Sequence, residues 1–479
     1  MEERLSGGSQ ELAYTSAVRA IELFRSGTMS PVELAREVIA QAERVEPLVH
    51  AFAETFFESA IEGAKDAEKR YAAGTARPLE GLLVAVKEEV PIAGQLNTLG
   101  SVPLRHAVAG ETAILAQRIL DAGGIVHGRT TTPEFCCAPF TWSYLWDVTY
   151  NPWNRSYNAG GSSGGSAAAL AAGASTLATG SDIGGSIRIP ASFCGVVGFK
   201  PPYGRIPETS PFNLDHYCHE GPLARHVADC RLLENVLAGP DPSDVASIRP
   251  KLEIPSSLGS ISGLRIAFSP DLGCYPVEAA VASNSRRVVE RLRAAGSVVE
   301  EVRLPWSLDK LKEAARIHFG VIFGPSIADI YSAHRDDLTP YSRNFFEESE
   351  RVTKADLIAG LELECEIYRP LGELLERYDA LVCPTFAIPA LPASWSVGDP
   401  LEVDGVPVVD WLDVMMTIPF NIASRCPVMS VPSGLSGDGV PTGISIVGRT
   451  YDDPTVFRIA DALERIEPWL ASAATRPVL

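Results

Sequence analysis

Two clusters of glycine and serine hold the residues best suited to chemistry. Within the stretch 158–203, Gly-Gly-Ser occurs at 160–166 and again at 184–186, and the residues between are mostly small, with many alanines. Glycine permits backbone angles closed to other residues and lets a ligand approach the main chain closely. Two such clusters, each presenting a serine, indicate a site built from backbone N–H groups and hydroxyls.

A serine nucleophile needs a base, and Lys87 is a candidate. The ordinary lysine pKa of about 10.4 makes a poor base at neutral pH, but burial disfavours the charged form and lowers the pKa. Lys87 follows the apolar run 82–86, which is typical of a buried strand. A serine could relay protons between Lys87 and a nucleophilic serine, and the N–H groups before Ser186 could form an oxyanion hole. From these residues alone, a salt-bridged Lys87 and structural Gly-Ser turns remain the stronger interpretation.

Other kinds of site find less support. Residues 161–165 match the G-x-S-x-G nucleophile elbow with Ser163 at its centre, but polar residues precede them where the elbow needs a buried strand. No Walker-type phosphate loop occurs. The eight histidines are dispersed, and the spacing of His216 and His219 is not specific for a metal, so we expect neither a metal nor a cofactor.

Composition argues against several classes of protein. The 479 residues are 46% hydrophobic and 21% charged, as in soluble globular proteins. The net charge of −19 argues against a nucleic-acid partner, because phosphate contacts need clustered lysine and arginine. No apolar run reaches the ~18–20 residues of a membrane span, and the N-terminus lacks the apolar region of a signal peptide. Nine scattered cysteines without a CxxC motif indicate reduced thiols, so we expect a cytoplasmic protein.

The elements that must position these residues alternate between helix and strand, which predicts an α/β fold. One helix begins with a capping box formed by Ser30 and Glu33. Helices are predicted over 14–26, 31–46, 58–73, 111–123, 166–173, 225–238, 276–295 and 454–467, and strands at 82–86, 125–128, 177–180, 196–199, 264–268, 298–302 and 444–448. Residues 204–222 lack periodicity and predict a long loop, suited to a lid or pocket wall. The β–α–β unit over 264–302 first suggests a second subdomain.

Longer motifs resemble the amidase signature family. They are Lys87, GGSSGGSAAALAAG at 160–173 and GSDIGGSIRIPASFCGVVGFKPPYGR at 180–205, with further stretches at 78–87, 128–135, 417–421 and 440–444. Ser162 lies 75 residues after Lys87 and Ser186 lies 24 residues after Ser162, as is typical of that family. The resemblance is strong over 78–240, recognisable at 14–60 and 380–465, and weak at 240–380.

The resemblance implies a fold and its division. The family has one α/β/α domain with a large, mixed, twisted β-sheet covered by helices on both faces, so residues 260–303 are expected in the same sheet. Residues 1–75 would form an N-terminal helical part packed on the core. Residues 76–479 would form the catalytic domain, in which 240–380 is a variable, largely helical region.

The resemblance also implies roles. Ser186 is expected to be the nucleophile, Ser162 the bridging serine that usually follows a cis peptide in this family, and Lys87 the base. Backbone N–H groups would form the oxyanion hole, from Ile183, Gly184, Gly185 and Ser186. Three further side chains would support the site: Ser163 by hydrogen bonding near Lys87, and Asp182 and Arg188 by bracing the loop.

The reaction implied is acyl transfer to water. We expect hydrolysis of a C–N bond in a small-molecule amide, with esters and carbamates (urethanes) as further substrates, by a monomer or homodimer. Some relatives instead provide the amidase component of a tRNA-dependent amidotransferase. The loop 204–222 does not resemble that group, and the acidic composition gives no indication of tRNA binding.

Substrate-binding residues are predicted from their positions. Cys136 and Ala138 should pass close to the acyl site, and Phe212 in the loop 204–222 should cover it. The aromatics Trp142, Tyr144 and Trp146 form either a further wall or ordinary packing. Such a pocket favours an apolar or aryl amide over a small charged one.

Two departures from the family pattern stand near these motifs. Glu88-Glu89 follows Lys87 where members often have Asp and then a polar residue, and Pro201-Pro202-Tyr203 replaces a common Pro-Thr-Tyr. We expect neither departure to touch the three catalytic positions.

Overall fold

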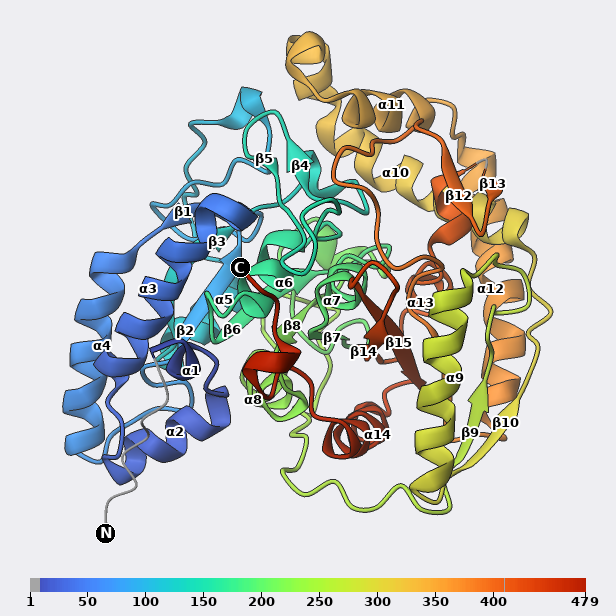
Figure 1. Cartoon of the computed structure of the whole chain (residues 1–479). Coiled ribbons are helices and arrows are strands. Elements are labelled where there is room, and N and C mark those ends of the chain that lie inside the picture. Colours follow the sequence, from blue (N-terminus) through green and yellow to red (C-terminus); the bar gives the residue numbers. More distant parts are fainter. Residues whose placement is uncertain (1–8, 409) are drawn as a thin grey trace.

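A sheet of eleven strands crosses the whole molecule (Figure 1). The computed structural model describes residues 9–408 and 410–479. The strand order is β1-β3-β2-β6-β8-β7-β14-β15-β11-β9-β10. The strands are β1 (Phe52–Thr55), β2 (Leu83–Lys87), β3 (Ile125–Thr130), β6 (Leu177–Ser181), β7 (Val197–Lys200), β8 (Glu220–Ala224), β9 (Arg265–Phe268), β10 (Val298–Glu301), β11 (Ala380–Pro384), β14 (Val428–Leu435) and β15 (Pro441–Gly448). Small two-stranded sheets pair β4 (Trp142–Ser143) with β5 (Asp147–Val148) and β12 (Leu401–Val403) with β13 (Val406–Val408).

The pairing in the large sheet is mixed. Strand β2 is parallel to β3 and β6, and β9 is parallel to β10 and β11. The strands between these groups are antiparallel to their neighbours. The unit formed by β9, helix α9 (Ala279–Ala294) and β10 extends this same sheet at its edge, so the suggestion of a second subdomain is wrong and the family-based expectation for 260–303 is confirmed.

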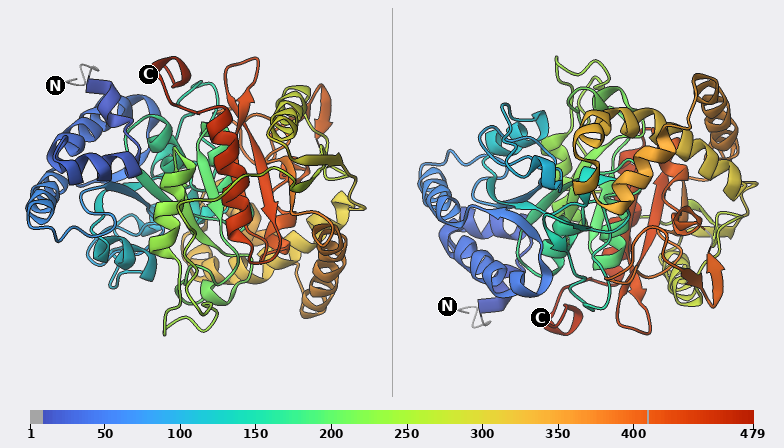
Figure 2. Two further views of the ribbon diagram at one scale, coloured as in Figure 1. Left: turned by 90° about the horizontal axis from the view of Figure 1, so that it is seen from below. Right: turned by 90° about the horizontal axis from the view of Figure 1, so that it is seen from above.

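Helices cover the sheet on both faces (Figure 2). They are α1 (Ser9–Ala13), α2 (Ala17–Ser26), α3 (Pro31–Val49), α4 (Phe57–Ala72), α5 (Ile114–Asp121), α6 (Gly164–Ala171), α7 (Arg188–Cys194), α8 (Val227–Leu237), α9 (Ala279–Ala294), α10 (Leu308–His334), α11 (Pro340–Ser349), α12 (Lys354–Leu375), α13 (Pro419–Ile422) and α14 (Asp453–Ile466). Seen from below, α8 and α14 lie across the sheet, and from above α10 does. The predicted fold, a large mixed sheet between helices, is confirmed.

Most predicted elements form within a few residues of their expected ends. The capping box of α3 is present, since Ser30 Oγ accepts from the N–H of Glu33 and Glu33 accepts from the N–H of Ser30. Helix α6 is buried on every side because it lies between the sheet and other helices, and its small side chains allow that close approach. In the described part of the chain, no helix is both long and apolar enough to cross a membrane.

Two of the strands outside the predicted ranges show why local sequence did not predict them. Strand β8 begins inside the expected loop 204–222. The segment Glu220-Gly221-Pro222 has no strand pattern, so the sequence did not predict it, and pairing with β6 and β7 on its two sides holds it as a strand. Strand β1 comes from the part expected to be helical, and it pairs antiparallel with β3. The division of the chain at residue 75 stays a prediction.

Candidate active site

Lys87 stands at the carboxyl end of β2, which lies between β3 and β6 in the sheet, and its side chain is fully buried. Its Nζ atom lies 2.7 Å from the Oγ atom of Ser162. The peptide bond between Gly161 and Ser162 is cis. A Cβ atom on Gly161 would lie 2.3 Å from the carbonyl oxygen of Phe140, so only glycine fits before this serine. The structure thus brings together the lysine and the first serine predicted from sequence.

Ser186 lies in the loop between β6 and α7, with 7% of its surface exposed. The N–H of Ser163 donates to the carbonyl oxygen of Ser186 over 3.1 Å, which joins the two Gly-Ser clusters directly. Four consecutive N–H groups of this loop, on Ile183, Gly184, Gly185 and Ser186, donate to no partner within the described residues. They are therefore available to a substrate oxygen.

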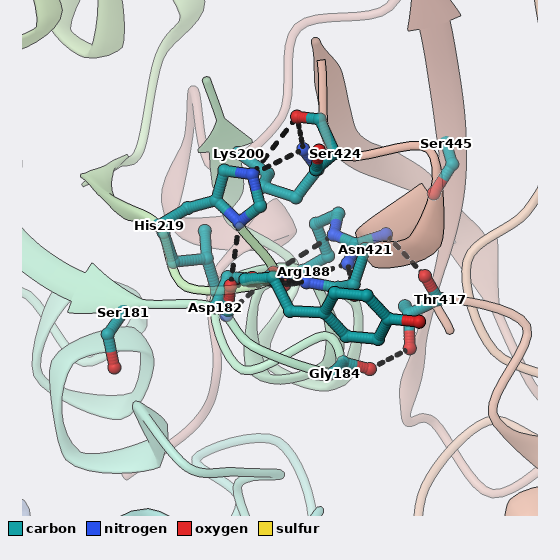
Figure 3. Close-up of polar contacts among 12 residues, drawn as sticks. Ser181, Asp182, Gly184, Arg188, Lys200, His219, Thr417, Asn421, Ser424 and Ser445 are labelled. Atoms are coloured by element: carbon teal, nitrogen blue, oxygen red, sulfur yellow. Dashed lines mark hydrogen bonds and ion pairs between the residues drawn. The ribbon is translucent and has the colours of Figure 1, made fainter. Parts of the chain in front are cut away.

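Asp182 and Arg188 form a buried ion pair that closes the loop at its base (Figure 3). The Arg188 Nη2 and Nε atoms lie 2.8 and 2.9 Å from the two Asp182 carboxylate oxygens. Asn421 donates to Asp182 Oδ1 over 2.8 Å, and Thr417 Oγ1 donates to the carbonyl oxygen of Gly184 over 2.6 Å. Burial alone would raise the pKa of Asp182, but Arg188 together with Asn421 outweighs burial, and the net pKa is lowered. The loop is therefore held by charge and by the segment 417–421.

The histidine just before β8 completes this brace. Burial, together with Lys200, lowers the pKa of His219 to about 3, so its ring is neutral. Its Nδ1 lies 3.0 Å from the carbonyl oxygen of Asp182, and its Nε2 lies 3.1 Å from the carbonyl oxygen of Ser424 and 3.3 Å from Lys200 Nζ (Figure 3). Asn421, Thr417 and His219 had no predicted role in the site, although 417–421 was among the stretches that resemble the family.

Ser163 contacts the site indirectly. Its hydroxyl donates to the carbonyl oxygen of Ser181 over 3.3 Å rather than to Lys87. The hydroxyl of Ser181, at the end of β6, does contact Lys87, with 2.9 Å between Oγ and Nζ. Ser181 is thus a residue of the site that sequence reasoning missed.

Glu89 is the second residue of the site that sequence reasoning missed. The expectation that the Glu88-Glu89 departure from the family pattern leaves the catalytic positions untouched is wrong. Its Oε1 atom lies 2.9 Å from Lys87 Nζ and accepts a hydrogen bond from Ser181 Oγ. The reason is a tight turn after β2, closed by a 3.1 Å hydrogen bond from Val90 N to Lys87 O, which folds Glu89 back over Lys87. The thiol of Cys136 donates to the other oxygen of Glu89.

Glu89 changes the protonation of Lys87. Burial lowers the pKa of Lys87, but Cys136 and Glu89 outweigh burial, and the net pKa is raised. The pKa of Glu89 is correspondingly lowered: burial opposes this direction, but the Lys87 ammonium together with the hydrogen bonds from Cys136 and Ser181 outweighs burial. Lys87 and Glu89 therefore form an ion pair in which the ammonium is fully buried and the carboxylate is 16% exposed.

Comparison with known proteins decides the family. A family model described as Amidase matches residues 33–457. The chain belongs to the amidase family. It is 32% identical over 475 residues to an acylamidase of Rhodococcus erythropolis, covering 96% of this chain and 97% of that one. It is also 32% identical to a glutamyl-tRNA(Gln) amidotransferase subunit of Chloroflexus aggregans, over 96% of this chain and 98% of the relative.

A solved structure agrees with this membership. A bacterial aryl acylamidase of the amidase signature family superposes on this amidase with a TM-score of 0.88 at 28% identity, over 96% of this chain and 97% of that one. The predicted family and the predicted class of enzyme, an amidase acting on C–N bonds outside peptides, are confirmed.

Two cavities of this amidase meet at the candidate site. We name the first the acyl cavity; Ser186 and Gly184 line it, and its other walls are mostly apolar, from Cys136, Cys137, Ala138, Pro139, Ile189, Phe319, Phe323, Phe345, Trp411 and Met415. The second, of about 470 Å³, contains Ser162 and Ser181, and we name it the acidic cavity for its residues Glu89, Glu208 and Glu220. Cys136, Ile183 and Phe323 line both cavities, so the two are neighbours.

The predicted substrate-binding residues line these cavities. Cys136 borders both, Ala138 borders the acyl cavity, and Phe212, in the short helix Phe212–Leu214, borders the acidic cavity. Trp142 instead stacks on Phe140, with ring centroids 6.1 Å apart, and it lies outside the described lining of either cavity. Tyr144 and Trp146 are likewise outside that lining, so ordinary packing is the better interpretation of this aromatic group.

One cluster has the composition of a metal site. Asp215, His216 and His318 bring their ligand atoms within 4.8 Å of one another. His318 Nε2 lies 2.7 Å from Asp215 Oδ1, and His216 Nε2 lies 3.0 Å from a carboxylate oxygen of Glu364. These nitrogens are thus engaged with carboxylates, and the contacts fasten the segment 204–222 to α10 and α12.

Proposed function

We propose that this amidase hydrolyses a small-molecule amide through an acyl-enzyme on Ser186, with Ser162 as proton relay and Lys87 as base. The observation that carries this proposal is the 2.7 Å contact of Lys87 Nζ with Ser162 Oγ, deep in the sheet and beside the loop that presents Ser186. A lysine that is neutral can accept a proton from a serine, and a serine can pass one on.

The first half of the reaction forms the acyl-enzyme. Ser162 takes the proton of the Ser186 hydroxyl and gives its own proton to neutral Lys87. Ser186 Oγ attacks the carbonyl carbon, and the oxyanion accepts hydrogen bonds from the N–H groups of Ile183, Gly184 and Gly185. One such donor is worth roughly 3 kcal/mol in the transition state. The proton then returns from Lys87 through Ser162 to the leaving nitrogen, and the C–N bond breaks.

The second half releases the acid. Water attacks the ester on Ser186 and gives a proton to the Ser162–Lys87 pair, and that proton returns to Ser186 Oγ as the ester bond breaks. The brace formed by Asp182 and Arg188 supports this scheme because the N–H donors must keep their positions while charge develops. The same steps serve esters and carbamates, which we include among the substrates.

The acyl cavity supports an apolar acyl group. Its walls around Ser186 are largely aromatic and aliphatic, with Phe319, Phe345 and Met415 among them. Burial of an apolar group there is favourable by about 25 cal/mol per Å². The cavity is small, at about 30 Å³, so short apolar acyl groups are the proposed class.

The test uses amides, esters and carbamates that share one chromogenic leaving group. We expect the wild-type enzyme to hydrolyse an apolar amide, and Ser186→Ala to lose that activity. The matched control is Ser156→Ala, which removes an exposed hydroxyl just before the first Gly-Ser cluster. Undiminished activity of purified, folded Ser186→Ala would overturn the proposed nucleophile.

A second candidate function follows from the amidotransferase relatives. The glutamyl-tRNA(Gln) amidotransferase subunit of Chloroflexus aggregans is as similar to this chain, at 32% identity, as the acylamidase is. We favour an amidase that acts by itself, as a monomer or homodimer, because the net charge of −19 offers little to a tRNA. Gel filtration of the purified protein with a glutaminase assay distinguishes the two: activity on glutamine that appears only on adding partner proteins would support the second.

A further inference from the structure

The acidic cavity combines carboxyl groups with an apolar wall. Glu89, Glu208 and Glu220 lie on one part of its surface. Apolar side chains form much of the remainder, among them Leu99, Phe135, Phe212, Phe323, Ile327 and Ile330. A volume of about 470 Å³ lies within the range of small-molecule sites. Such a cavity suits a ligand that is apolar along its length and charged at one point.

Glu208 and Glu220 have few hydrogen-bond donors that could stabilise a negative charge. No N–H or hydroxyl group of the described residues donates to Oε2 of either side chain, and Glu220 is only 7% exposed. Burial raises the pKa of Glu208 to about 7, and burial together with the neighbouring Glu208 and Glu89 carboxylates raises that of Glu220 well above its usual range. The negative charge of this pair is therefore poorly compensated within the protein, and a cation in the cavity would stabilise it.

In the proposed reaction, the leaving group lies in the acidic cavity. Ser186 and Gly184, proposed to hold the acyl carbon and its oxygen, line the acyl cavity. Ser162, proposed to deliver the proton to the leaving nitrogen, lines the acidic cavity. An amide that spans both therefore places its amine part among the three glutamates.

The protonation state of Lys87 favours the binding of a cation in the acidic cavity. Lys87 must be neutral to act as a base, and Glu89 then loses the ammonium that lies 2.9 Å away. A buried carboxylate left without its partner is strongly unfavourable. A positively charged substrate group beside Glu89 would replace the lost charge and so favour the neutral, reactive form of Lys87. Besides Lys87 and the glutamates, the titratable groups around Glu89 are Cys136 and Cys218.

We propose that the acidic cavity binds an amine leaving group that carries a second, positively charged nitrogen. The substrate class is then a singly acylated diamine, with an apolar acyl group in the acyl cavity and an ammonium beside Glu89, Glu208 and Glu220. This inference rests on the proposed function, because it uses Ser162 to orient the substrate.

The test compares two amides with the same butanoyl group. One is the amide of 4-(aminomethyl)aniline, acylated on the aniline nitrogen, and the other is the amide of 4-methylaniline, which is neutral. At pH 7.5 we expect kcat/KM to be about tenfold higher for the cationic amide, a difference of ~1.4 kcal/mol. Glu220→Gln and Glu208→Gln should reduce this ratio, whereas Glu111→Gln, which changes an exposed glutamate outside the cavity lining, should leave the ratio unchanged.

A second measurement needs no variant. Free 4-(aminomethyl)aniline should inhibit the wild-type enzyme at about tenfold lower concentration than 4-methylaniline, and the difference should shrink in high salt. Hydrolysis of both amides with equal kcat/KM, or with the neutral amide preferred, overturns this inference and leaves the proposed function intact. Failure to hydrolyse any amide, ester or carbamate overturns the proposed function instead.

Discussion

Glu89 Oε1 lies 2.9 Å from Lys87 Nζ, inside the sheet and next to the cis peptide that precedes Ser162. The proposed base is therefore a partner in an ion pair, not an isolated buried lysine. Burial favours neutral Lys87, whereas Cys136 and Glu89 favour the ammonium, and their combined effect is the larger. The reactivity of the site therefore depends on how readily Lys87 loses its proton while it is paired with Glu89.

Removing the carboxylate should make Lys87 a base at lower pH. Glu89→Gln keeps the size of the side chain but removes a charge that raises the pKa of Lys87, and an opposite charge at this distance is worth about 1–3 pKa units. Because the neutral lysine is the active form, the acid limb of kcat/KM for a neutral anilide should move to lower pH by about one unit or more. A pH–rate profile of Glu89→Gln that superimposes on the wild-type profile would contradict this assignment, and Glu111→Gln serves as the control.

Loss of the base should slow the chemical step while leaving the fold in place. Lys87→Met preserves most of the apolar volume at the end of β2 and cannot accept a proton. General-base catalysis contributes about 10²- to 10⁴-fold, so kcat for an apolar anilide should fall by that factor, with a far smaller change in KM. Single-turnover kinetics measure the step directly. If Lys87→Met keeps more than half of the wild-type kcat, Lys87 is not the base.

The loop that carries the N–H donors should tolerate a methyl group at one glycine better than at the next. Gly185 has a φ of +132°, and a Cβ there would lie 2.3 Å from Thr417 Oγ1. At Gly184 the nearest atoms would be side-chain carbons of Ile418 and Phe319 at 3.3 Å. Gly185→Ala should displace the donors and lower kcat by about 10²-fold or more, whereas Gly184→Ala should be milder. Equal rates for the two variants would show that Gly185 has no special place in the site.

The ion pair below the loop should be a large contributor to stability. Asp182→Asn leaves the buried guanidinium of Arg188 without its counter-charge, and breaking such a pair costs about 3–5 kcal/mol. The folded-state pKa of Asp182 is lowered, so its stabilising effect is present above the unfolded pKa of about 3.9 and is lost only as pH falls through the folded value. Urea unfolding should therefore give the same difference between wild type and variant at pH 6 and pH 8.

The exposed pair of Asp66 with Lys69 provides the matched control for that measurement. Its N–O distance, 2.7 Å, is close to the 2.8 Å of the buried pair, but both side chains are more than 70% exposed. Asp66→Asn should therefore leave the unfolding midpoint nearly unchanged. A comparable loss in both variants would mean that the effect of Asp182 comes from something other than burial.

The sequence predicted the parts of the site that lie in long, unusual motifs. Lys87, Ser162 and the two Gly-Ser clusters all lie in such motifs. The glycines of these motifs are required wherever another backbone comes within contact distance, as at Gly161. The alternation of elements and the family resemblance together predicted the mixed sheet, and the resemblance placed 260–303 in it.

Contacts that depend on tertiary pairing could not be predicted in the same way. Strand β8 has no strand pattern of its own and exists because β6 and β7 pair with it. Glu89 reaches Lys87 only through the turn at Val90, and nothing in the order Lys-Glu-Glu distinguishes a side chain that folds back from one that points to solvent. Both cases are decided by geometry outside the local sequence.

Helix α10 borders both cavities. Phe319 lines the acyl cavity, Ile327 lines the acidic cavity, and Phe323 lines both. None of the proposed catalytic residues belongs to this helix. A library confined to these three positions, which span about two turns of one helix, should therefore shift the preference for acid and for amine together. These three positions therefore form a small starting set for laboratory evolution toward a new substrate.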